Sequence, residues 1–192
     1  MKKILLIVAA ALVSTGAFAQ KFAHVNFNEL VTLMPEADKA REAMDASSKE
    51  AQETYQAMVE EFNSKYQVYQ SKASTWTQAI REAKEKELTD VQQRIQEFEQ
   101  SVQQELQQQN QQLMAPIYQK ATETVKTLAK KAGYIYVIDV NSALYIDDAQ
   151  SVDLTKEARK VLGIADDRTL ESLQAELQAK AAAAQQAAQP AK

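Results

Sequence analysis

The stretch YQAMVEEFNSKYQVYQSKASTWTQAI, residues 55–80, carries a regular apolar pattern. Small or apolar residues recur in it at alternating steps of four and three, at Tyr55, Val59, Phe62, Tyr66, Tyr69, Ala73, Trp76 and Ile80. This spacing is typical of a coiled-coil seam, in which each apolar residue faces a neighbouring helix. The stretch therefore predicts a long helix that needs a second helix beside it.

The second helix is predicted directly downstream, where steps of three and four continue through Leu88, Val91, Ile95, Phe98, Val102 and Leu106. Between the two seams, Thr75 and Gln78 fit a capping box, with Thr75 as the N-cap. We therefore expect a tip near residues 72–76 that folds the chain back into an antiparallel helical hairpin arm over residues 36–116. Pro35 suits the start of this arm and Pro116 its end.

Strand patterns lie on both sides of the arm. FAHVNF, residues 22–27, alternates as a strand does, and YIYVIDV, residues 134–140, is rich in β-branched and aromatic residues. A turn at Asn141-Ser142 followed by ALYI, residues 143–146, predicts a β-hairpin, and a closing helix is expected over residues 156–162. Residues 20–35 and 117–164 would then form a β-rich base of about 64 residues, a size at which a single core is marginal. We expect identical copies to share this base.

The N-terminus has the three parts of an export signal. Lys2 and Lys3 precede an apolar run, and Ala17-Phe18-Ala19 supplies a cleavage pattern, so residues 1–19 are predicted to be a signal peptide. No later apolar run is long enough to span a bilayer. The chain has no cysteine that could carry a lipid or a disulfide. These features predict a protein that is soluble in the periplasm after cleavage.

Charge and residue content exclude several function classes. With a net charge of −4 and a pI of about 5.2, the chain lacks the excess of positive charge that nucleic acid binding needs. Anionic lipid is an equally poor partner for the same reason. His24 is the only histidine, and no phosphate loop, nucleophile elbow or zinc motif occurs. Four aspartates at positions 139, 147, 148 and 153 match no calcium loop and are interpreted as strand ends and a cap. We expect no enzyme activity, no metal and no cofactor.

Two polar segments remain. QQELQQQNQQ, residues 103–112, is interpreted as a solvated helix face, with a functional polar lining as the alternative. Residues 165–192 form an Ala/Gln-rich tail that is expected to be partly helical and, over its last dozen residues, disordered.

Four apolar residues of the arm are candidates for contact with other molecules. Trp76 either covers Ala73 and Ile80 as a cap at the tip or leaves much of its ring exposed as a binding surface. Met58, Val68 and Met114 lie off the predicted seams. Soft apolar residues scattered over a flexible polar arm suit a binder of low selectivity.

The order of these segments resembles the Skp/OmpH family of periplasmic chaperones. The resemblance rests on Phe22-Ala23-His24-Val25-Asn26, the long helical hairpin, the block from Gly133 to Tyr145, and Val152-Asp153-Leu154-Thr155 before the last helix. It implies an α+β, mostly α fold, in which a coiled-coil tentacle projects from a small β-barrel-type oligomerisation base. It also implies a homotrimer that holds unfolded outer-membrane β-barrel proteins between three arms without ATP. Well-known enterobacterial members are strongly basic whereas this chain is acidic, so no lipopolysaccharide or anionic-membrane site is carried over.

Two other functions share part of this pattern. A structural coiled-coil scaffold or adaptor of the cell envelope would have the same seams but would bind one folded partner tightly. A membrane-surface binder would need a basic amphipathic helix, which the alternating charges of REAKEKEL, residues 81–88, do not provide.

Overall fold

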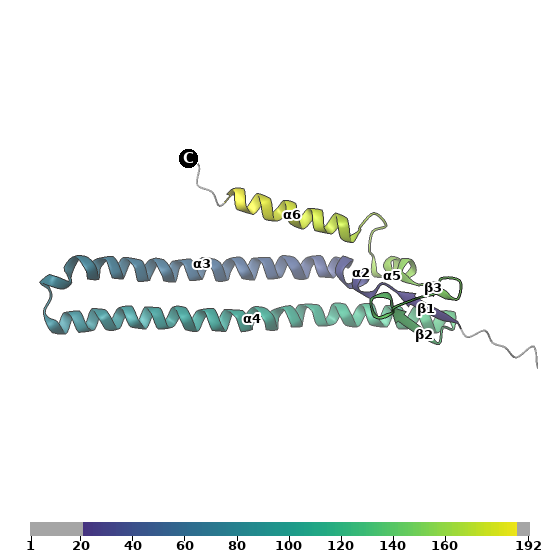
Figure 1. Ribbon diagram of the computed structural model, residues 1–192, viewed down its shortest axis with the longest axis horizontal. Coiled ribbons are helices and arrows are strands. Elements are labelled where there is room, and N and C mark those ends of the chain that lie inside the picture. The colour runs from purple at the N-terminus through teal and green to yellow at the C-terminus, as the bar shows by residue number, and fades with distance from the viewer. Residues whose placement is uncertain (1–20, 188–192) are drawn as a thin grey trace, which may run out of the picture. The chain divides into compact units, whose positions relative to one another are not determined.

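The computed structural model describes residues 21–187, and the chain divides into two compact units (Figure 1). One unit, here called the arm, is Pro35–Ile117. The other, here called the base, comprises the described residues up to Met34 and from Tyr118 onward. The signal peptide predicted at residues 1–19 lies outside the described residues.

Two long helices form the arm. α3 (Pro35–Lys72) is followed by a short 3-10 turn, η2 (Ala73–Thr75), and then by α4 (Gln78–Ala132), which continues through Pro116. Contacts across the helices join Ser47 to Gln109, Glu61 to Arg94 and Tyr69 to Glu85. In these contacts, residues further along α3 meet residues that come earlier in α4. The helices therefore lie side by side and run in opposite directions (Figure 1).

The turn at the tip differs from the predicted capping box. The Thr75 hydroxyl donates a hydrogen bond to the carbonyl of Lys72 at 2.8 Å, so it belongs to the end of α3. Thr77 is the residue whose hydroxyl accepts from the Ile80 backbone N–H, at 3.4 Å. The Gln78 side chain donates forward to Glu82 and does not reach back. The N-cap was predicted two residues too early, because Thr75 still belongs to η2 and α4 begins only at Gln78.

A small parallel sheet lies in the base. β1 (Phe22–Val25) is central, with β2 (Tyr136–Asp139) on one side and β3 (Ser151–Asp153) on the other. Both neighbours run parallel to β1, and Phe22 is in register with Tyr136 and Ser151. The described part of this chain thus forms an open three-stranded sheet and not a closed barrel.

The predicted β-hairpin over residues 134–146 is wrong. The Asp139 carboxylate accepts hydrogen bonds from the backbone and side-chain nitrogens of Asn141, at 3.2 and 3.1 Å, and this turns the chain into η3 (Val140–Ser142). Leu144 and Tyr145, expected in the second strand, lie exposed in a loop. The second edge of β1 is instead occupied by β3.

Helices and the central strand together supply the core of the base. Most of the buried apolar residues come from β1, α2 (Phe27–Leu33), the end of α4 and α5 (Thr155–Leu162), and they include Val25, Leu30, Leu33, Ala121, Val125, Ala158 and Leu162. The Asn26 side chain caps α2 by accepting from the Glu29 N–H at 3.1 Å. Left-handed glycines end two of these helices, Gly133 with φ 74° after α4 and Gly163 with φ 72° after α5.

The tail is more regular than expected. α6 (Leu170–Ala187) contacts α2, and its Leu173 is buried. Because this helix reaches Ala187, the expectation of disorder over the last dozen residues is wrong for residues 181–187.

Candidate functional site

The arm contains very little buried apolar surface. Among residues 41–116, all of which the structure describes, Val91 on α4 is the only buried side chain, with 2% exposure. Seam residues such as Val59 and Phe62 are half-buried, and Tyr66 and Ile80 are exposed. A pair of helices has no third layer to cover its seam, so these apolar side chains stay partly accessible.

Ion pairs on both sides of Val91 link the two helices. One nitrogen of Arg94 lies 3.1 Å and 3.2 Å from the two carboxylate oxygens of Glu61, and the Lys65 ammonium lies 3.6 Å from Glu87. A hydrogen bond from Lys84 lowers the pKa of Glu87, with smaller contributions from Lys65. Exposed pairs of this kind stabilise a protein only slightly. The arm is therefore held together by a thin seam.

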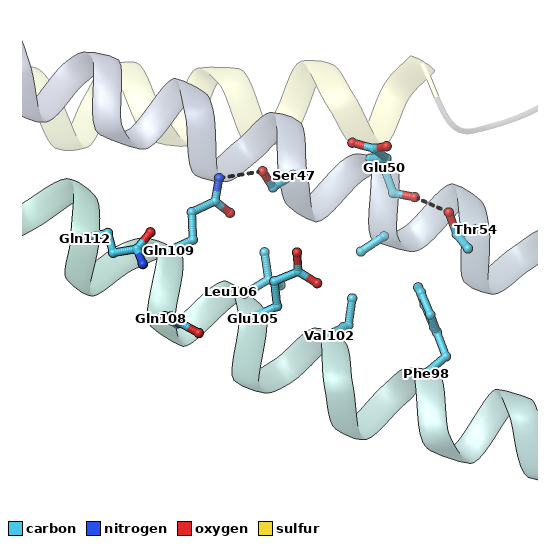
Figure 2. Close-up of a pocket in the computed structure, with 11 residues that line it drawn as sticks. Ser47, Glu50, Thr54, Phe98, Val102, Glu105, Leu106, Gln108, Gln109 and Gln112 are labelled. Carbon is cyan, nitrogen blue, oxygen red and sulfur yellow. Dashed lines mark hydrogen bonds between the residues drawn. The ribbon is translucent and has the colours of Figure 1, made fainter.

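A groove of about 550 Å³ separates α3 from α4 in one part of the arm. Its α3 wall contains three small residues, Ser47, Ala51 and Thr54, together with Glu50. Phe98 and Val102 extend from α4 toward α3 (Figure 2). The small residues are too short to fill the space opposite the larger ones. A hydrogen bond of 2.9 Å from the Gln109 side chain to the Ser47 hydroxyl joins the two walls.

The glutamine run contributes to this groove. Gln108, Gln109 and Gln112 line it, and Gln108 and Gln112 are also exposed, so these residues form both a polar lining and a solvated helix face. A functional role for this lining stays a prediction. The groove itself was missed in the sequence. One sequence feature could have indicated it. The part of α3 before Tyr55 has alanine, serine and threonine, whereas the part from Tyr55 onward has tyrosines and a phenylalanine.

At the tip, Trp76 packs against a tyrosine. The rings of Trp76 and Tyr69 meet edge to face, with centroids 6.0 Å apart, and Trp76 is half-buried. The Tyr69 hydroxyl donates a hydrogen bond across the helices to the Glu85 carboxylate, and this bond raises the pKa of Tyr69. Part of the Trp76 ring is thus fixed against the arm and part remains accessible.

The other predicted contact residues are spread along the arm. Val68 is 43% exposed, whereas Met58 and Met114 are half-buried. Met58 and Val68 are separated by ten residues of α3, or about 15 Å at about 1.5 Å per residue. They form a dispersed apolar surface and do not converge on one site with Trp76.

The base exposes apolar residues along its strands. Tyr136 and Ile138 of β2 are 63% and 45% exposed, and Val152 of β3 is also exposed. Among residues 21–187, each of these strands pairs with β1 on one side only and has a free edge on the other. Uncovered strand edges with apolar side chains are sites at which another chain can pair or pack.

Three titratable residues of the base, His24, Asp139 and Asp153, make hydrogen bonds that join or cap its elements. His24 is buried on β1, and its Nδ1 lies 2.8 Å from the Ser151 hydroxyl of β3. The Asp139 carboxylate accepts from the Phe27 N–H at 3.3 Å, and that of Asp153 from the Thr155 N–H at 2.8 Å. Among residues 21–187, no cluster of three histidine, aspartate or glutamate side chains could hold a metal ion. Within the same residues, no helix has the length and apolar character needed to cross a membrane.

Comparison with known proteins gives two matches of different kinds. Residues 21–162 match the protein family described as outer membrane protein (OmpH-like). A solved structure from Caulobacter crescentus, described as a candidate outer membrane chaperone (OmpH-like), has a TM-score of 0.66 and 13% sequence identity. That match covers 80% of this chain and 92% of the other, and at this identity it shows a shared fold. No curated protein matched the sequence. α6 lies C-terminal to the residues that match the family.

Proposed function

The chain belongs to the OmpH-like family of outer membrane proteins, and we propose that it is an ATP-independent periplasmic holdase chaperone. In this proposal the arms bind unfolded outer-membrane proteins and prevent their aggregation. The observation that carries the proposal is the arm itself, a pair of long helices with one buried side chain between residues 41 and 116. Its partly exposed apolar residues can make many weak contacts with an unfolded chain.

Weak and dispersed contacts suit the retention of a client that must later fold. Each contact alone is easily broken, but several engaged together raise the overall affinity through effective concentration. Separating one unfolded chain from another removes the encounter that leads to aggregation. Release needs no nucleotide, because a client that folds into a membrane buries its apolar side chains there and no longer presents them to the arms.

The base is proposed to assemble three copies. The free edges of β2 and β3, with exposed Tyr136, Ile138 and Val152, would be covered by neighbouring subunits. A small barrel built from the three open sheets would leave no free edge. Three arms attached to one base would then surround a shared client.

Trp76, Met58, Val68 and Met114 are proposed as client contacts. Their exposure ranges from half-buried to 43% for Val68, so each could contribute some apolar surface to a bound chain. The acidic net charge supports no site for lipopolysaccharide or anionic lipid. Residues 1–19 are proposed to direct export and to be removed.

Light scattering tests the proposal against its main rival, a scaffold of the cell envelope. An unfolded outer-membrane β-barrel protein is diluted out of urea with and without residues 20–192 of this protein. A holdase is expected to suppress scattering at about one trimer per client, whereas a scaffold specific for a folded partner would leave the scattering unchanged even in excess. Analytical ultracentrifugation of the same sample should give three times the mass of one chain, and a stable monomer would refute the proposed assembly.

A further inference from the structure

The groove between α3 and α4 combines an apolar floor with acidic residues. Ala51 from α3 and Phe98, Val102 and Leu106 from α4 supply the apolar surface. Glu50 and Glu105 also line the groove, and no lysine or arginine does. Figure 2 shows the Glu105 side chain on the side of α4 that faces α3. The groove therefore offers both apolar contact and negative charge to the same occupant.

The two carboxylates are not neutralised within the described part of the chain. Among residues 21–187, neither Glu50 nor Glu105 has an ion-pair partner, whereas Glu61 and Glu87 elsewhere in the arm are paired with Arg94 and Lys65. A carboxylate beside apolar surface interacts favourably with a cation brought to the same place. The groove can therefore bind a positively charged group without first breaking an ion pair.

The negative charge is concentrated around the groove. Residues 42–54 of α3 contain four acidic residues and one lysine, and residues 95–112 of α4 contain three acidic residues and no basic one. The segment nearer the tip, residues 81–94, has four acidic and four basic residues. The excess of negative charge is thus a local property of the helical segments that form the groove.

We propose that this groove binds an aromatic or branched aliphatic side chain that stands next to lysine or arginine in an unfolded client. The inference rests on the proposed holdase function and gives the arm a preferred kind of client segment. The volume of about 550 Å³ is within the range of protein pockets that accept ligands of this size. The apolar side chain would contact Phe98 and Val102, and the neighbouring cation would lie near Glu105.

Peptide binding tests this assignment directly. Two labelled peptides with the same apolar residues, one with lysines beside them and one with glutamates, are titrated with residues 20–192 and followed by fluorescence anisotropy. We expect the lysine peptide to bind about tenfold more tightly at low salt and to lose most of this advantage at about 1 M salt, where the Debye length is about 3 Å. Equal binding of the two peptides would overturn the inference.

Two pairs of variants locate the site. Glu105→Gln should weaken lysine-peptide binding about two- to fivefold, as expected for an exposed charge pair. Glu99→Gln, on the same helix but outside the residues that line the groove, removes the same charge and should weaken binding less. Ala51→Leu fills the groove and should weaken binding about tenfold, while Ala57→Leu, at an exposed position of α3 outside the groove, should not. Circular dichroism checks that all four variants keep their helix content.

The outcomes separate the inference from the function on which it rests. Equal effects of Glu105→Gln and Glu99→Gln, or unchanged binding in Ala51→Leu, would overturn the groove assignment. The client-aggregation assay is run on the same preparations. If the protein suppresses aggregation but either variant pair fails, the groove assignment falls and the holdase proposal stands. If the unaltered protein does not suppress aggregation, the holdase proposal itself is refuted.

Discussion

Replacing Val91 with alanine should loosen the arm without unfolding the base. Val91 is the single buried side chain between residues 41 and 116, and two cross-helix ion pairs flank it. The substitution removes two methyl groups at about 0.8 kcal/mol each, or about 1.6 kcal/mol in total. The surrounding helices can move together to close the gap, so the cost of a residual cavity is small. We expect a local destabilisation of about 1.5 to 2 kcal/mol.

Hydrogen exchange measured by mass spectrometry detects this loss where it occurs. A change of about 1.4 kcal/mol corresponds to a tenfold change in an equilibrium constant, so amide exchange in the arm should accelerate about 10- to 30-fold. Peptides from residues 58–66 and 86–98 should report the change. Amides near Ala121 and Val125, in the core of the base, should keep their rates.

Val68→Ala is the matched control, because it makes the same chemical change at a position that is 43% exposed on α3. It should alter exchange less than about threefold, since surface substitutions usually change stability by no more than about 0.5 kcal/mol. Equal acceleration in the two variants would show that Val91 does not hold the helices together. Acceleration in the base as large as that in the arm would show that the two units unfold as one.

Three further predictions concern the tip and the base. Below pH 10.0 the Tyr69 hydroxyl remains protonated and bonded to Glu85, and this contact is lost as the pH rises through the raised pKa of Tyr69. Fluorescence of Trp76, the only tryptophan, should therefore fall with a midpoint above pH 10.0, and Tyr69→Phe should abolish that step. Gly163→Ala should lower stability to urea by about 1 kcal/mol, because an alanine is strained at φ 72°. Open space surrounds the added methyl group, so no clash adds to this cost, and Gly163→Asn should cost less. Arg159→Met should cost about 2 kcal/mol in the same assay, since it removes hydrogen bonds to two backbone carbonyls and the ion pair with Glu29, and an unchanged urea midpoint would contradict this assignment.

Elements with a local periodic signal could be predicted from the sequence. The steps of three and four through Val59, Phe62, Val91 and Phe98 indicate helices because only a helix places those positions on one face. β1 and β2 were expected where they occur, since alternating and β-branched residues favour extended backbone. Gly163 marks the end of α5 because its left-handed conformation is costly for other residues.

Features that depend on distant parts of the chain required the three-dimensional structure. β3 consists of Ser-Val-Asp, which has no strong strand signal, and it becomes a strand because β1 offers it an edge. The parallel order of the sheet follows from pairing Phe22 with residues more than a hundred positions away, which no local pattern encodes. The groove has the same origin. Ala51 and Phe98 are ordinary residues of two separate helices, and only the register between α3 and α4 makes the small side chains of one helix and the large side chains of the other line the same groove.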